Sequence, residues 1–262
     1  MKLGKILSGT VVAVGMILGS AANAATVDLG FALDASGSVG ATNFATTRNG
    51  LAAALDLIPT SGVNDYRIAV YSYASSPVQV VPPTVVTAAN IAAIKTAVQN
   101  TTYTGGGTGT ASVIAAMTAA FVGVGLGDTT LFNISTDGRP NSQAATQTAA
   151  LAAHAAGVDG LSFEAIGRGT VSTSLQNAML SIAFPGTPVL VTDLSAIPDA
   201  TTTGFVIPVN GFAAYEAAIG AKVQSIVDNT GGGPSVVPLP AGLPLLLAGL
   251  GAFGILRRKS AI

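Results

Sequence analysis

Between residues 25 and 230, short apolar runs alternate with longer segments in which apolar residues recur at helical spacing. The short runs predict strands at residues 27–33, 67–73, 78–81, 129–135, 161–166 and 205–209. The longer segments predict helices at residues 42–57, 88–98, 111–122, 142–156 and 213–227. Strands that alternate with helices predict the α/β fold class, with one doubly wound, mostly parallel sheet carrying helices on both faces.

Two segments interrupt this pattern. Pro82 and Pro83 follow the third expected strand and are expected to end it. Residues 182–203 are rich in Pro, Thr and Ala and lack a clear period, so they are expected to form a long connection or an insertion.

The N-terminal end is typical of a secretory signal. Lys2 and Lys5 precede an uncharged stretch over residues 6–20, and Ala22-Asn23-Ala24 fits a small-x-small cleavage site. We therefore expect residues 1–24 to be a signal peptide and the mature chain to be exported.

The C-terminal end also has three parts in order. A glycine-rich break at residues 231–234 precedes an uncharged run over residues 236–256, and a basic cluster follows at residues 257–259. The uncharged run is expected to enter a membrane as a transmembrane helix, with the basic cluster on the cytoplasmic side. The folded domain is then residues 25–230, and residues 231–262 are a linker plus a C-terminal sorting or transmembrane tail.

This tail resembles the PEP-CTERM sorting tails in their VPLPA variant, through the sequence Val-Pro-Leu-Pro-Ala at residues 237–241 and the apolar and basic segments after it. The resemblance implies an exosortase-type sorting enzyme as a partner in a Gram-negative bacterium. It also implies anchoring in the inner membrane during transit, followed by location at the cell surface or in the extracellular matrix. Leu239 stands where the name motif of the group has Glu, which puts cleavage of the tail in doubt, and an ordinary C-terminal anchor is the alternative.

The composition narrows the class of partner. Charged residues make up 9% of the chain, against about 25% in an average soluble domain. All 12 acids and only six bases lie between the two basic ends, and this excess of acid argues against binding to nucleic acid. The chain has no cysteine, so disulfides and thiolate metal sites are excluded.

Oxygen-rich side chains follow the expected strands. Asp34, Ser36 and Ser38 come directly after the first strand, Thr108 lies in a glycine-rich loop before a helix, and Asp137 follows a later strand. Ligands bind such sheets outside the carboxyl ends of the strands, so these side chains are expected to meet. Oxygen ligands suit a hard divalent cation. A turn in which one of the serines caps the next helix is the alternative for the first motif.

In these three motifs the chain resembles von Willebrand factor A (vWA) domains that carry a metal-ion-dependent adhesion site. The resemblance implies a Rossmann-like fold with one antiparallel edge strand and a divalent cation, Mg²⁺ first, with Mn²⁺ and Ca²⁺ also accepted by the same oxygens. It implies that the cation meets an acidic group on a protein or polysaccharide partner. The metal ligands that it implies are Asp34, Ser36, Ser38, Thr108 and Asp137, with Thr110 as the rival for the threonine.

A non-enzymatic binding or adhesion protein is therefore the favoured interpretation. A structural protein of the extracellular matrix is the first alternative, because low charge and abundant Ala, Gly and Thr fit it equally well. A metal-assisted hydrolase is the second. The only histidine, His154, lies in an Ala-rich helical window, and the chain has no Gly-x-Ser-x-Gly elbow, so a Ser-His-Asp triad is not expected.

Overall fold

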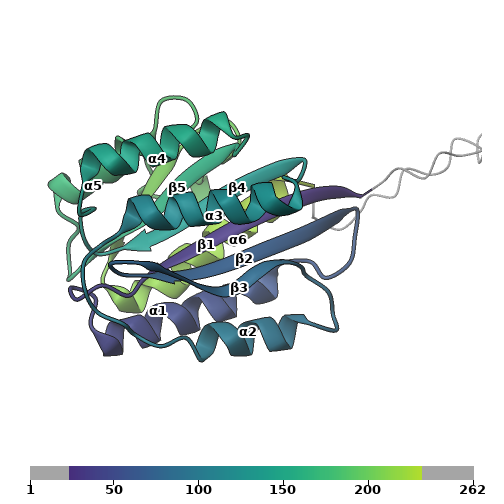
Figure 1. The fold of residues 1–262 in the computed structure, drawn as a ribbon, viewed down its shortest axis with the longest axis horizontal. Helices are drawn as coiled ribbons and strands as arrows, with labels where there is room; N and C mark the ends of the chain where they lie inside the picture. The colour runs from purple at the N-terminus through teal and green to yellow at the C-terminus, as the bar shows by residue number, and fades with distance from the viewer. Residues whose placement is uncertain (1–23, 232–262) are drawn as a thin grey trace, which may run out of the picture.

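The computed structural model describes residues 24–231. A central sheet lies between two layers of helices (Figure 1). The expected C-terminal tail and nearly all of the expected signal peptide lie outside the described residues. Within residues 24–231, no helix combines the length and the apolar character needed to cross a membrane.

The sheet has seven strands in the order β3-β2-β1-β4-β5-β7-β6. Every neighbouring pair is parallel except β2 and β3 at one edge. This confirms the prediction of a mostly parallel sheet with one antiparallel edge strand. The strands are β1 (Ala25–Asp34), β2 (Asn64–Tyr73), β3 (Pro77–Val85), β4 (Thr129–Thr136), β5 (Gly160–Gly167), β6 (Val189–Leu190) and β7 (Phe205–Asn210).

The antiparallel edge strand β3 is longer than the sequence predicted. It was expected to stop before Pro82, but it runs on to Val85. Its register with β2 shifts between Val81, which pairs with Val70, and Thr84, which pairs with Ile68. The two prolines lie in this irregular stretch. Because one side of an edge strand has no partner, the missing N–H groups of proline are tolerated there.

All five expected helices are present, and a sixth, α5, was not foreseen. Figure 1 shows α1, α2 and α6 on one face of the sheet and α3, α4 and α5 on the other. The helices are α1 (Ala41–Ala54), α2 (Ile91–Gln99), α3 (Thr110–Val124), α4 (Gln143–Ala155), α5 (Thr173–Leu180) and α6 (Tyr215–Asn229), with 3₁₀ turns η1 (Leu55–Leu57), η2 (Leu194–Ala196) and η3 (Phe212–Ala214). The fold is thus α/β with both faces covered, as predicted.

The central strand β1 is buried on both faces. Leu29, Phe31 and Leu33 point toward α1 and α6, while Ala32 belongs to the core cluster on the α3 side. In the sequence, strands buried on both faces are continuous apolar runs and do not alternate between apolar and polar residues. Burial on both sides fixes the end of β1, and with it the start of the loop that follows.

The two ends of the described chain lie together at the amino edge of the sheet. Ala25 begins β1 beside Asn64, the first residue of β2. At the other end of the domain, Thr230 Oγ1 lies 2.9 Å from the hydroxyl of Tyr66, two residues further along β2. The parallel strands therefore end at the side of the sheet opposite to both chain ends. This side is called the carboxyl edge and is distinct from the edge strands β3 and β6.

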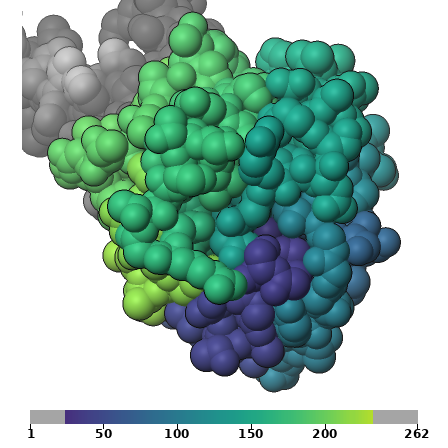
Figure 2. Space-filling model, turned by 90° about the vertical axis from the view of Figure 1, so that its left-hand side faces the viewer, coloured from purple at the N-terminus to yellow at the C-terminus, as the bar shows by residue number. Residues whose placement is uncertain are grey.

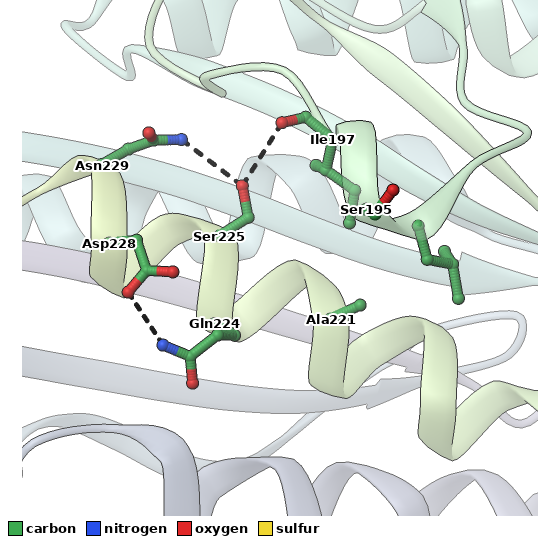
Figure 3. A pocket seen from close by; sticks show the side chains of 8 residues that line it. Ser195, Ile197, Ala221, Gln224, Ser225, Asp228 and Asn229 are labelled. Carbon is green, nitrogen blue, oxygen red and sulfur yellow. Dashed lines mark hydrogen bonds between the residues drawn. The ribbon is translucent and has the colours of Figure 1, made fainter. Parts of the chain in front are cut away.

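Residues 182–203 form the long connection that the sequence predicted, and they also supply β6. This two-residue strand pairs in parallel with β7 and closes the sheet on that side. Beyond it, the Ser225 hydroxyl of α6 donates a weak hydrogen bond of 3.5 Å to the carbonyl oxygen of Ile197 (Figure 3). A hollow of about 380 Å³ lies between this connection and α6.

Candidate metal centre

The five candidate residues come together at the carboxyl edge of the sheet. Asp34 is the last residue of β1, Asp137 directly follows β4, and Thr108 precedes α3 by two residues. The chain leaves β1 toward β2 on one side, and β4 lies on the other, so this is the point at which the winding of the sheet reverses. Figure 2 looks onto this edge, where the early, purple part of the chain reaches the surface between teal and green segments.

Asp34 is almost fully buried, and its carboxylate is held in place from two sides. The backbone N–H of Ser36 donates to Oδ1 at 2.8 Å. The hydroxyl of Thr136 donates to Oδ2 at 2.6 Å, across the gap between β1 and β4. Each carboxylate oxygen has a second lone pair, so Asp34 is oriented and can still accept a further ligand.

Ser38 joins the first loop to Asp137. Its hydroxyl donates a hydrogen bond of 2.6 Å to Oδ1 of Asp137 and lies 3.1 Å from the hydroxyl of Ser36. The oxygens of Ser36, Ser38 and Asp137 therefore form a connected row. Neither serine caps α1, because Gly40 is the N-cap residue and no side chain bonds to the first turn. The capping alternative is thus not what the structure shows.

Thr108 faces this row, and its rival Thr110 does not. A Cβ atom placed on Gly138 would lie 3.3 Å from Oγ1 of Thr108 and 3.4 Å from Oγ of Ser38. Gly138 thus leaves open a small space that is flanked by these two hydroxyls. Thr110 is 1% exposed at the start of α3, and its hydroxyl has no hydrogen-bond partner there. The geometry therefore favours Thr108 as the threonine of the set.

The glycine-rich loop is tied to the loop after β1 by its backbone. Gly37 N–H donates to the carbonyl oxygen of Gly106 at 2.9 Å, and Gly105 N–H donates to that of Ala35 at 2.9 Å. Gly105 and Gly106 have φ angles of +69° and +105°, which side chains rarely adopt. The glycines thus let the two loops approach closely enough for Thr108 to reach the site.

Three polar residues that the sequence did not single out support the set. Thr136 links Asp34 to the next loop, since its hydroxyl donates to Asp34 and its oxygen accepts from the backbone N–H of Gly138 at 3.1 Å. The side-chain oxygen of Asn141 accepts from the backbone N–H of Thr108, and the backbone N–H of Asn141 donates to the carbonyl oxygen of Thr108. The hydroxyl of Ser75 accepts from the N–H of Gly107 at 3.0 Å. These residues position the candidate ligands without belonging to the open space.

For the carboxylates of Asp34 and Asp137, hydrogen bonds and nearby positive charge do not fully offset the effect of burial on the pKa. Burial raises the pKa of Asp34 from 3.8 to about 6, against the opposing effect of its hydrogen bonds to Ser36 and Thr136. Burial also raises the pKa of Asp137, which the Ser38 hydrogen bond and the charge of Arg168 partly offset. A cation placed between the two carboxylates would favour their charged forms.

These residues fit a hard divalent cation. The set offers two carboxylates and three hydroxyls, all of them oxygen donors of the type that Mg²⁺, Mn²⁺ and Ca²⁺ prefer. Within residues 24–231, no three side chains from His, Cys, Asp and Glu gather closely enough to hold a metal. A cation in this part of the chain would therefore depend on the serine and threonine hydroxyls in addition to the two aspartates.

His154 stands apart from this set. It lies near the C-terminal end of α4, where its Nδ1 is 3.1 Å from the carbonyl oxygen of Val158 and its ring packs 4.9 Å from the ring of Phe184. Neither partner is a nucleophile or a carboxylate. The structure thus gives no support for a triad built on the only histidine.

The comparison with protein families identifies the fold and the class of the site. The model of the von Willebrand factor type A domain matches residues 28–202, and the chain belongs to this family. Domains of this type are typically binding and adhesion modules without catalytic activity. No curated protein matches the chain.

Solved structures of similar fold include a matrix protein and a pilus adhesin. Proximal thread matrix protein 1 from the mussel byssus, solved with a zinc-occupied MIDAS motif, is 19% identical with a TM-score of 0.56, over 77% of this chain and 46% of that one. The pilus adhesin SpaC from Lactobacillus rhamnosus GG is 17% identical with a TM-score of 0.60, over 80% and 31%. The conserved hypothetical protein BatB from Bacteroides thetaiotaomicron is 15% identical with a TM-score of 0.56, over 79% and 99%.

This chain spans less than half the length of the byssus protein and of the pilus adhesin. At these identities the likeness shows a common fold. In the byssus protein, zinc occupies a metal-ion-dependent adhesion site (MIDAS) motif.

Proposed function

We propose that this protein is an exported, envelope-associated adhesion or binding protein that engages an acidic group on its partner through a divalent cation, Mg²⁺ in the first place. The observation that carries the proposal is the meeting of Asp34, Ser36, Ser38, Thr108 and Asp137 at one edge of a vWA domain. These five residues would hold the cation.

The composition of this set suits the binding of an acid. A bound cation would offer an electron-poor position that accepts a carboxylate oxygen from a partner. Among residues 24–231, only two carboxylates lie at the site, and the positive charge of Arg168 is close to one of them. The charge of Arg168 offsets part of the negative charge of the two carboxylates, so a bound dication would keep a net positive charge. It would therefore bind an acidic ligand more tightly than a neutral one.

The place of the site in the fold agrees with a tethered binding protein. Both ends of the described chain lie at the amino edge of the sheet, and the candidate metal centre lies at the carboxyl edge. A signal peptide and a C-terminal sorting tail would join the domain at the amino edge. The centre would then face away from the membrane, toward the surroundings of the cell. This proposal also includes export, sorting of the tail by an exosortase-type enzyme, and a location at the cell surface or in the matrix.

The test begins with the cation alone. Calorimetric titration of residues 25–230 with Mg²⁺ and Mn²⁺ is expected to show binding that Asp34→Ala abolishes while the thermal transition stays cooperative. Asp65→Ala, which removes an exposed carboxylate at the amino edge, is the matched control and should bind as the unaltered protein does. Equal metal affinity in the Asp34→Ala variant would refute the assignment.

A second experiment separates adhesion from a matrix role. The purified domain is incubated with cells of its own source, and a chelator is added. Adhesion through the cation predicts release by the chelator and recovery with Mg²⁺, with the circular dichroism spectrum unchanged. Retention in the presence of the chelator would favour a structural matrix protein instead.

A further inference from the structure

The cations of the described residues are distributed unevenly. Residues 24–231 contain six Lys and Arg residues. Arg67, Lys95 and Lys222 each form a salt bridge with a carboxylate. Arg48 donates to a backbone carbonyl of the loop after α2. The two that remain, Arg139 and Arg168, follow β4 and β5 at the edge of the sheet that holds the candidate metal centre.

Arg139 and Arg168 are exposed there without a carboxylate at salt-bridge distance among the described residues. Arg168 donates from Nη2 to the carbonyl oxygen of Ser38. Arg139 makes only a weak contact of 3.5 Å from Nη1 to the hydroxyl of Ser174. Each guanidinium has five N–H donors, so most of their donors face solvent. In a chain with an excess of acid, two exposed cations that form no salt bridge among the described residues favour the binding of an external anion at this site.

A hollow beside the centre connects Arg168 to the candidate ligands, while Arg139 lies outside its lining. It has a volume of about 240 Å³ and begins at Ser38 and Asp137. From there it continues past Arg168 to the exposed hydroxyls of Thr170 and Ser172, with apolar atoms of Leu175 in its wall. Asp137, which already serves the candidate metal centre, is the only carboxylate that the described residues contribute to its lining. Arg168, Thr170 and Ser172 add donors suited to an anion or to hydroxyl groups.

From this arrangement we infer that the ligand is an acidic polysaccharide that carries at least two carboxylates. One carboxylate meets the cation, and a second occupies the hollow, where Arg168 binds it and Arg139 adds charge. This inference rests on the proposed function, because it assigns the ligand class of the same site. A polymer of uronic acids supplies such carboxylates at regular spacing, together with hydroxyl groups for Thr170 and Ser172.

The surface around the hollow argues against a protein partner. Protein interfaces are centred on apolar and aromatic anchors that fill pockets. No exposed large hydrophobic residue of the described chain lines this hollow, and none of the exposed ones is aromatic. A polar, hydrated polyanion needs no such anchor, because charge-assisted hydrogen bonds and the cation hold it.

The test compares defined oligomers at Mn²⁺ concentrations that saturate each variant. Oligogalacturonate is the probe, a neutral glucan oligomer is the negative control, and oligoglutamate represents an acidic peptide. Arg168→Gln is expected to weaken binding of oligogalacturonate about 10-fold, as the loss of one charge-assisted contact. Arg139→Gln, which touches none of the five candidate ligands, is expected to weaken it severalfold. Arg168→Lys keeps the charge and should recover part of the loss.

Salt dependence gives a second readout. Affinity of the unaltered protein for oligogalacturonate should fall steeply with added NaCl, and the double variant Arg139→Gln/Arg168→Gln should show a flatter dependence. Lys95→Gln, which removes an equal charge from α2 on one face of the sheet, is the matched control and should match the unaltered protein in both affinity and slope.

The outcomes separate this inference from the proposed function. Equal oligogalacturonate affinity in the double variant and the unaltered protein would overturn the second subsite while leaving metal-dependent adhesion in place. Tighter binding of oligoglutamate than of oligogalacturonate would overturn the polysaccharide assignment in favour of an acidic protein. Failure of the unaltered protein to bind Mg²⁺ or Mn²⁺ at all would instead refute the proposed function.

Discussion

The hydroxyl of Ser38 donates a 2.6 Å hydrogen bond to Oδ1 of Asp137, across 99 residues of chain. This bond joins the loop after β1 to the loop after β4, in addition to the hydrogen bond from Thr136 to Asp34. Ser38 is exposed and Asp137 is half-buried, so the bond is expected to add only about 1 kcal/mol to the free energy of unfolding. Its larger role is to bring two candidate ligands to one point.

Ser38→Ala should therefore separate metal affinity from stability. Removal of the hydroxyl deletes one oxygen donor and releases Asp137 from its partner. We expect Mn²⁺ affinity to fall at least 10-fold, while the free energy of unfolding in the absence of metal changes by about 1 kcal/mol. Calorimetry and urea unfolding measure the two quantities. Ser61→Ala, at an exposed serine outside the sheet, is the control, and a loss of metal affinity there would count against a local effect.

Gly138→Ala tests the open space itself. The added Cβ would lie 3.3 Å from Oγ1 of Thr108 and 3.4 Å from Oγ of Ser38, where it competes with a cation for the same space. The φ of Gly138 lies outside the range that favours glycine, so the backbone accepts alanine. We expect weaker Mg²⁺ binding with a nearly unchanged melting temperature.

The matched control for this change is Gly220→Ala in α6, where the added Cβ makes an ordinary contact of 3.8 Å with Leu57. Alanine in a helix should raise stability by about 0.5–1 kcal/mol and leave metal binding as it is. Undiminished Mg²⁺ affinity in Gly138→Ala would show that the cation does not use the space between the two hydroxyls.

The fold class could be predicted from the sequence, and the five candidate residues could be named from it, because both depend on local signals; the role of the five as metal ligands stays a prediction. The apolar run of β1 and the polar residues after it can be read without tertiary information. Strand ends in a parallel sheet gather at one edge, so Asp34 and Asp137 were expected to meet. The family pattern favoured Thr108 over Thr110, and the coordinates add that Thr110 is buried as the first residue of α3, whereas Thr108 lies in the loop before it.

Other features could not be predicted because they depend on contacts between distant segments. β3 continues through Pro82 and Pro83 only because it lies at the edge of the sheet, and no local signal marks an edge. β6 is two residues long and owes its existence to β7. The role of Asn141 depends on a loop 33 residues away. Supporting polar residues of this kind become visible only after the fold is known.

Asp34 should make the stability of the metal-free protein sensitive to pH. The pKa of Asp34 is about 6 in the folded state, against 3.8 for the unfolded chain. The folded state therefore binds the proton more tightly. The resulting stabilisation is complete below pH 3.8 and is lost as the pH rises through 6, with a total of about 3 kcal/mol.

The measurement compares Asp34→Asn with the unaltered protein by urea unfolding between pH 4 and 8 without metal. The difference in the free energy of unfolding should shift in favour of the variant as the pH rises, because asparagine does not titrate. Saturating Mg²⁺ should reduce this shift, since a bound cation stabilises the charged carboxylate. Parallel pH profiles of the two proteins in the absence of metal would disprove the assignment.

The buried ion pair between Lys222 of α6 and Glu164 of β5 gives the last prediction. Nζ of Lys222 lies 2.6 Å from Oε1 of Glu164, and both side chains are within 1% of complete burial. Burial lowers the pKa of Lys222 and raises that of Glu164, so each charge depends on the other. Lys222→Met leaves a buried carboxyl group without its partner and should cost about 3–5 kcal/mol.

The double variant Glu164→Leu/Lys222→Met should recover most of this loss, because two apolar side chains in a dry core need no partner. Chemical unfolding of the unaltered protein, of the two single variants Glu164→Leu and Lys222→Met, and of the double variant forms a complete thermodynamic cycle. A double variant no more stable than Lys222→Met would show that α6 is held to the sheet by other contacts. Mg²⁺ affinity measured on the double variant then tells whether the attachment of α6 to β5 influences the centre at the carboxyl edge.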